Sequence, residues 1–265
     1  MSVAETYLPE VAPTQGAAPL EKPFRVQPLK ALRALGRLLK DKEDTARVFE
    51  IMRALSGRSI PDGYARLLKT PAGGSIAFRH QELADILSDK AFLSRLPEGS
   101  VGRTYLQFTT SENISAQGLI EESRKGIEDG IDSEHPYAWY GRRLRDIHDL
   151  WHVLTGYGRD ALGEASLVAF SYAQTKSHGF GLIAAAGALK LRQEVRGQSY
   201  ARAVWEGYRN GRKAAWLPGE DYVRLLAEPL SAARARLNIA RPETYETVPP
   251  ALRNGNGGMM AAAQA

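Results

Sequence analysis

The sequence contains no cysteine among its 265 residues. It therefore has no disulfide scaffold, no thiolate zinc or iron–sulfur site and no thiol nucleophile. Any bound metal must be held by nitrogen and oxygen ligands. Long apolar runs are also missing. The longest covers 180–191, about 12 residues, whereas a helix that crosses a bilayer needs roughly 20. The sequence therefore predicts no membrane-spanning helix.

Positive and negative charges are nearly balanced. The chain has 35 Lys and Arg against 30 Asp and Glu, a net charge of +5. This mild basic balance is compatible with an anionic membrane surface, an acidic ligand or nucleic acid. No basic patch interleaved with aromatic residues is evident, so we expect no nucleic-acid partner. The hydrophobic fraction of 43% is high enough for a buried core.

The two ends have compositions that differ from the rest of the chain. Residues 1–22 are rich in Ala and Pro, and residues 246–265 include the run Asn-Gly-Asn-Gly-Gly. Such compositions are typical of flexible tails. Glu5 stands where an export signal would carry positive charge, and no apolar region follows it. We expect one folded domain over 23–245, with a flexible tail on either side.

Helical periodicity recurs along the chain, and strand alternation is almost absent. The expected helices cover 28–40, 44–57, 81–96, 103–110, 115–125, 136–155, 161–178, 181–195, 200–217 and 221–239. The sequence predicts an all-α protein, a single domain of roughly nine or ten helices. The segment 181–195 is apolar on nearly all sides, which indicates a central position. Pro229 lies inside the last segment and should kink it.

The segment 28–40 has a strongly two-sided pattern. At 100° per residue, its leucines fall on one broad side and its basic residues on the other. The leucines are Leu29, Leu32, Leu35, Leu38 and Leu39, and the basic residues are Lys30, Arg33, Arg37 and Lys40. Such a helix can lie on anionic lipid, or it can be an ordinary surface helix whose leucines face the core. The sequence leaves both interpretations open.

Two of the five histidines, His148 and His152, are four residues apart on a predicted helix. They are separated by about 40° around the helix axis, and Asp149 lies about 60° beyond His152. Two imidazoles one turn apart with a carboxylate beside them form a metal-binding arrangement. The alternative is a pair of hydrogen-bonded histidines at the edge of the core.

A fourth ligand is suggested by Glu164, which follows the glycines Gly156 and Gly158. In a continuous helix Glu164 would lie about 18 Å from His152 along the axis. A chain reversal at the glycines would return it to the histidines, as in metal sites built between facing helices. Otherwise Glu164 is a carboxylate that interacts with the helix dipole of its own first turn. Beside the histidines, Arg142, Arg143 and Arg145 form either a site for an anionic substrate group or a solvated face.

The run His148-Asp149-Leu-Trp-His152, followed after eleven residues by Glu164, resembles the signature of the coenzyme Q (ubiquinone) biosynthesis protein four family. The surrounding residues 145–157 and 162–164 also resemble this family's most specific stretch. Two further segments, 96–103 and 229–239, agree with it. The resemblance covers roughly residues 25–240.

The resemblance implies an all-helical protein that acts on polyprenylated quinone precursors and associates with membranes and with other ubiquinone-biosynthesis proteins. It implies a divalent-metal site at His148, Asp149, His152 and Glu164, with zinc expected first and Fe(II) or Mn(II) as alternatives. The implied activity is removal of the C1 carboxyl group of a polyprenyl hydroxybenzoate, in some members with hydroxylation at that carbon. We assign catalytic roles to Asp149 and to Arg145, which would hold the substrate carboxylate. The prenyl tail would lie along 180–191.

Other interpretations remain at this point. The chain could be a non-catalytic scaffold that binds prenyl lipid, or a zincin-like hydrolase in which Asp149 acts as general base. Self-association into a homodimer is left open. The first twenty residues contain acidic residues and no arginine, unlike a mitochondrial presequence. We therefore expect a bacterial cytoplasmic protein that binds peripherally to the inner face of the membrane.

Overall fold

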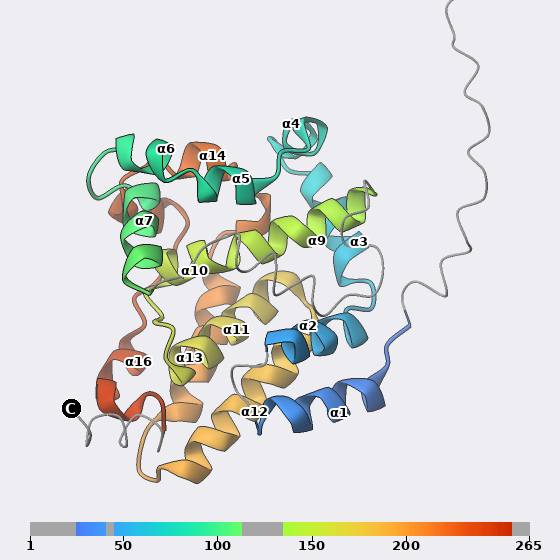
Figure 1. Cartoon of the computed structure of the whole chain (residues 1–265), viewed down its shortest axis with the longest axis vertical. Coiled ribbons are helices and arrows are strands. Elements are labelled where there is room, and N and C mark those ends of the chain that lie inside the picture. The colour runs from blue at the N-terminus through green and yellow to red at the C-terminus, as the bar shows by residue number, and fades with distance from the viewer. Residues whose placement is uncertain (1–24, 41–44, 113–134, 256–265) are drawn as a thin grey trace, which may run out of the picture.

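The computed structural model describes residues 25–40, 45–112 and 135–255. In chain order the helices are α1 (Pro28–Leu38), α2 (Thr45–Ala54), α3 (Ser59–Leu68), α4 (Gly73–Arg79), α5 (Leu83–Ser88), α6 (Lys90–Arg95), α7 (Val101–Ser111), α9 (Pro136–Asp146), α10 (His148–Thr155), α11 (Ala161–Thr175), α12 (His178–Glu194), α13 (Tyr200–Lys213), η1 (Leu217–Gly219), α14 (Tyr222–Leu225), α15 (Leu230–Arg236), α16 (Glu243–Thr247) and η2 (Pro250–Leu252) (Figure 1). These ranges contain no β-strand, which confirms the predicted all-α class. The expected helix 115–125 and the expected tail 1–22 lie outside the described residues.

Helix α11 is the central helix of the molecule. Eleven of its 15 residues are buried, and α12 and α13 pack against it. The expectation that 181–195 is central was wrong. In α12 only Gly179, Ala184 and Leu191 are buried, and Leu189 is 56% exposed. The small residues of α12 allow close packing on one face, and uniform apolarity alone does not show that the other face is covered.

Helices α11 and α13 approach each other closely through two glycines of α13. A Cβ atom on Gly207 would lie 2.3 Å from the carbonyl oxygen of Ser166, and one on Gly211 would lie 2.6 Å from that of Phe170. Both acceptor atoms belong to the backbone of α11, which cannot turn aside as a side chain can. The absence of side chains at these two positions therefore sets the distance between the two helices.

The expected continuous helix 136–155 is divided into α9 and α10. Ile147 separates them with φ −80° and ψ −7°, and its side chain is fully buried. This ψ departs from the usual helical value, so the regular helix is interrupted at a single residue. Helix α10 consequently begins at His148.

Pro229 does not kink a helix, as was expected, but separates two short ones. Its backbone is extended, with φ −56° and ψ 132°, and it pairs with Ser100 in an isolated bridge. The amide of Leu230 donates to the carbonyl of Gly99. Proline disfavours helical conformation in the residue before it, so no helix continues through residue 228, and α15 begins after Pro229.

The ordered chain extends beyond residue 245, the expected end of the domain. Tyr245 and Val248 are 3% and 1% exposed, and η2 follows them. Tyr245 packs edge-to-face against Tyr157, with ring centroids 5.5 Å apart. The buried side chain of Val248 therefore lies in a segment that composition alone assigned to a tail.

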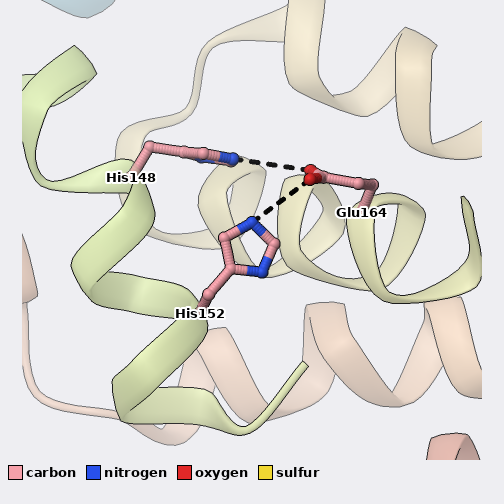
Figure 2. Close-up of side chains that lie close together, drawn as sticks. All are labelled: His148, His152 and Glu164. Carbon is pink, nitrogen blue, oxygen red and sulfur yellow. Dashed lines mark ion pairs between the residues drawn. The ribbon is translucent and has the colours of Figure 1, made fainter. Parts of the chain in front are cut away.

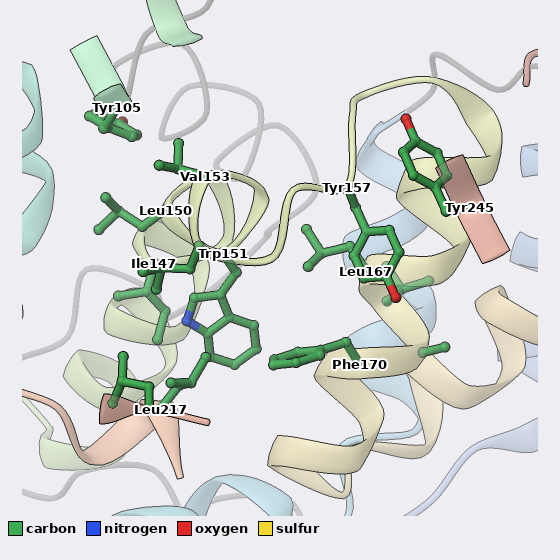
Figure 3. Packing of buried hydrophobic residues seen from close by; sticks show 14 of the residues in the cluster. Tyr105, Ile147, Leu150, Trp151, Val153, Tyr157, Leu167, Phe170, Leu217 and Tyr245 are labelled. Atoms are coloured by element: carbon green, nitrogen blue, oxygen red, sulfur yellow. The ribbon is translucent and has the colours of Figure 1, made fainter. Parts of the chain in front are cut away.

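Buried aromatic rings connect α10 to α11 (Figure 3). The rings of Trp151 and Phe170 meet edge-on, with centroids 5.8 Å apart. The indole nitrogen of Trp151 donates a 2.7 Å hydrogen bond to the hydroxyl of Tyr222. This contact fixes the rotation of α10 about its own axis, and so determines where its histidines point.

Candidate metal site

His148, His152 and Glu164 converge on one point between α10 and α11 (Figure 2). His148 Nε2 lies 3.5 Å from Glu164 Oε2, and His152 Nε2 lies 3.3 Å from Glu164 Oε1. The two imidazole rings are perpendicular, with centroids 5.1 Å apart. One ligand atom from each residue lies within 4.8 Å of the other two.

Local sequence signals explain this convergence. Helix α10 places the histidines one turn apart and ends at Gly156, whose φ of 81° is unfavourable for other residues. Asp160 then caps α11 by accepting a hydrogen bond from the amide of Gly163. The chain reverses between these two residues. Glu164, in the first turn of α11, therefore returns to the histidines, as the glycines predicted.

His152 is held in one orientation by its surroundings. Its side chain is fully buried, and Nδ1 lies 2.9 Å from the carbonyl oxygen of Tyr157. This carbonyl can only accept, so Nδ1 carries a proton and Nε2 is the nitrogen that faces Glu164. The ring of Phe108 stacks on the imidazole at 5.6 Å. Within the described chain, Nε2 is buried without a hydrogen bond.

The charges of the site support each other. Burial lowers the pKa of His152, but the Glu164 carboxylate outweighs burial, so the pKa is raised. Burial raises the pKa of Glu164, and the two histidines reverse this effect, so its pKa is well below the usual range. In the absence of a cation, the pair therefore favours an imidazolium and a carboxylate. A metal would displace that proton, so its binding is coupled to pH.

The residues fit a divalent cation. Ligands at about 2.0–2.2 Å from one tetrahedral ion lie about 3.4 Å apart, close to the observed 3.3 and 3.5 Å. A buried nitrogen without a hydrogen bond is the atom that such an ion would satisfy. Two imidazoles and one carboxylate suit zinc and also non-haem iron. Three protein ligands leave at least one coordination position for water or substrate.

Asp149 is not among the ligand atoms that converge. Burial raises the pKa of Tyr105 on α7, and the Asp149 carboxylate raises it further, which places this carboxylate within electrostatic reach of that phenol. The structure thus brings together three of the four residues that the sequence grouped. The 60° between Asp149 and His152 on the helix is enough to separate their ligand atoms.

Arg145 does not extend toward an open site. Its guanidinium lies 2.7 Å from the carboxylate of Asp146, and these side chains are 8% and 2% exposed. Arg142 pairs with Glu82 at 2.7 Å. Neither sequence interpretation of the arginine cluster accounts for these contacts, since Arg142 joins α9 to Glu82 and Arg145 pairs with a neighbour inside α9. Their partners are distant in sequence or depend on side-chain rotamers, so spacing gave no signal for them.

Two neighbours of the site were missed by sequence reasoning. Phe108 comes from α7, and nothing in its local sequence indicates a contact with α10. Arg159 lies in the connection between α10 and α11, with Nε 3.9 Å from Glu164 Oε1. The sequence did contain a signal for Arg159. It stands between Gly158 and the capping residue Asp160, in the loop that joins the helix of the histidines to the helix of Glu164.

Comparison with known proteins places the chain in a family. The family model for coenzyme Q (ubiquinone) biosynthesis protein Coq4 matches residues 27–243. The mitochondrial ubiquinone biosynthesis protein COQ4 homolog of Danio rerio is 31% identical over 180 residues, which cover 67% of this chain and 63% of that protein. The Aspergillus flavus protein coq4, also mitochondrial, is 27% identical over 176 residues, 66% of this chain and 59% of that protein.

The match spans slightly less than two thirds of the length of these curated relatives. A crystal structure of a Nostoc punctiforme protein has the same fold, with a TM-score of 0.57 and 21% identity. It covers 81% of this chain and 99% of that one. The matched residues 27–243 contain the whole site, from His148 to Glu164. The chain belongs to the coenzyme Q (ubiquinone) biosynthesis protein Coq4 family.

Proposed function

We propose that the protein acts in ubiquinone biosynthesis, where it removes the C1 carboxyl group of a polyprenylated hydroxybenzoate with the help of a divalent metal. The observation that carries this proposal is the convergence of His148, His152 and Glu164 on one point. Membership of a ubiquinone-biosynthesis family supports a quinone precursor as substrate and other ubiquinone-biosynthesis proteins as partners. Asp149 lies outside the converging group. We propose that it contacts the substrate or transfers a proton to it, and that it is not a metal ligand.

The exposure of the three residues indicates how substrate would reach them. The side chains of His148 and Glu164 are 24% and 37% exposed, whereas that of His152 is fully buried. The substrate would therefore approach over His148 and Glu164, with His152 and the Phe108 ring forming the closed side. The carbonyl of Tyr157 keeps the His152 ring from turning during the reaction.

The bound metal would supply a Lewis acid for the phenolic or carboxylate oxygen of the substrate. As carbon dioxide leaves, its bonding electrons remain on the ring carbon, which must gain a proton or be oxidised. Zinc suits protonation, because it has no redox chemistry. Hydroxylation at that carbon is a two-electron oxidation in which O2 would accept the electrons and be reduced. A redox-active metal such as Fe(II), which two histidines and one carboxylate can also hold, would mediate this transfer. The oxygen dependence of the product distinguishes these routes.

Turnover tests the proposed function directly. Protein loaded with Zn(II), Fe(II) or Mn(II) is incubated with a prenylated hydroxybenzoate, with and without oxygen, and the ring product is identified by mass spectrometry. We expect a product that has lost 44 Da as carbon dioxide, or its hydroxylated counterpart only with iron and oxygen. The doubly substituted His148→Ala/His152→Ala protein is the control. Unchanged substrate with all three metals, recovered bound to the protein, would instead support the non-catalytic scaffold.

Membrane association is proposed to involve α1. Its buried face consists of Ala31, Ala34 and Leu38, while Leu29 and Leu32 are 70% and 54% exposed. The interpretation that all five leucines face the core is therefore wrong. Among the described residues, no helix is long and apolar enough to span a bilayer. Exposed leucines beside the three basic residues of α1, with no acidic residue in the helix, fit an anionic lipid surface.

Changing these leucines is expected to reduce lipid binding. In co-sedimentation with vesicles that contain anionic lipid, Leu29→Ser/Leu32→Ser should lower the bound fraction several-fold, because burial of each leucine side chain contributes about 1.5–3 kcal/mol. Phe78→Ser is the matched control, since Phe78 is 91% exposed on α4, at the opposite end of the molecule (Figure 1). Equal binding by wild type and the leucine variant would contradict a role for α1.

A further inference from the structure

The proposed substrate carries a carboxylate, and the arginines expected to hold it are engaged elsewhere. Arg142 and Arg145 form ion pairs of 2.7 Å with Glu82 and Asp146. Arg143 is 4% exposed and donates to the backbone carbonyls of Pro218 and Glu220. Moving any of these guanidinium groups to a substrate would leave a partner without its cation. A different cation must meet the substrate carboxylate.

Arg159 has the position and the availability for this task. Its side chain is 38% exposed, and its Nε lies 3.9 Å from Glu164 Oε1, beyond hydrogen-bond distance. In the described ranges it forms no hydrogen bond and no other ion pair. Glu164 Oε1 is also the oxygen that His152 Nε2 faces at 3.3 Å. The guanidinium and the metal-binding imidazole therefore approach the same carboxylate oxygen.

The backbone around Arg159 is fixed on both sides. The amide of Gly158 donates to the hydroxyl of Tyr245 at 3.1 Å, and that hydroxyl donates to the carboxylate of Asp160. Asp160 in turn caps α11 through Gly163. Because both neighbours of Arg159 are held by one buried tyrosine, its Cα position is set, and the side chain alone is free to follow a ligand.

We propose that Arg159 binds the carboxylate of the aromatic substrate next to the metal position. This inference rests on the proposed function, which supplies the carboxylate. A cation bound by Glu164 and the histidines would partly neutralise the negative charge of Glu164. The attraction between Glu164 and Arg159 would then be weaker. The guanidinium then binds a second anion at the side where His148 and Glu164 are exposed. Arginine suits this role, because its planar group can bind both oxygens of a carboxylate.

The test compares an acid with its neutral amide. Zinc-loaded wild type, Arg159→Gln, Arg159→Lys and Arg145→Gln are titrated with 3-geranyl-4-hydroxybenzoate and with 3-geranyl-4-hydroxybenzamide, and binding is measured by calorimetry. We expect Arg159→Gln to weaken binding of the acid about tenfold or more, as for loss of a hydrogen bond to a charged group. Binding of the amide and zinc content should be unchanged. Arg159→Lys should recover part of the preference, and Arg145→Gln should keep it.

The remaining outcomes overturn the inference. These are equal binding of acid and amide by wild type, equal acid binding by wild type and Arg159→Gln, or loss of zinc together with the acid in that variant. The experiments also distinguish failure of the inference about Arg159 from failure of the proposed function. Turnover by wild type with no effect of Arg159→Gln on acid binding overturns this inference alone. Selective binding through Arg159 without conversion overturns only the decarboxylase proposal.

Discussion

Alanine in place of His148 is expected to lower the affinity of the protein for zinc by about 100-fold or more. Loss of an outer-shell partner alone typically lowers metal affinity by 10–100-fold, and loss of one of three converging ligands should cost at least as much. His148 is preferred to His152 because its side chain is 24% exposed, so truncation leaves no deep cavity. Zinc content after dialysis and competition with a chromophoric chelator give the affinity.

Two further variants and a matched control make this result specific. Glu164→Gln preserves shape and removes the charge, so it should also weaken zinc binding strongly. Asp149→Asn should weaken it much less, because Asp149 lies outside the converging group. His178→Ala removes an exposed histidine at the start of α12 and serves as the matched control. Equal zinc content in wild type and the His148 variant would refute the metal site, and a large loss in Asp149→Asn would restore the four-ligand set.

The part of the site that sequence predicted depends on local geometry. The spacing of His148 and His152 is decided within one helical turn. The return of Glu164 follows from Gly156 with its positive φ and from the Asp160 cap. These are short-range preferences, which the neighbouring residues alone determine. The all-α class followed from periodicity for the same reason.

Side-chain direction and long-range pairing could not be predicted in this way. The pairing of Arg145 with Asp146 depends on rotamers inside the folded core. The central position of α11 depends on which helices cover it, and this cannot be read from the apolar residues of α11 and α12 alone. Pro229 lies between two helices because the chain on both sides pairs with residues 99–102, more than a hundred residues earlier.

The largest expected effect on stability is that of Gly207→Ala. The added Cβ would lie 2.3 Å from the carbonyl oxygen of Ser166, so α13 must move away from α11. Overpacking of this kind costs about 1–3 kcal/mol or more, and the higher helix propensity of alanine offsets about 1 kcal/mol. Because the contact is with backbone, we expect the upper part of that range. The midpoint of thermal unfolding should fall by about 5 °C or more.

The same variant should weaken zinc binding, because Ser166 is two residues from Glu164 on α11. A displacement of α11 away from α13 changes the distance between Glu164 and the histidines on α10. Gly141→Ala is the matched control, since Gly141 lies within α9 and a Cβ there meets nothing within 4 Å. That variant should be as stable as wild type or up to about 1 kcal/mol more stable, with unchanged zinc affinity. Equal effects of the two substitutions, on unfolding and on zinc affinity, would show that the close approach of α11 and α13 does not position Glu164.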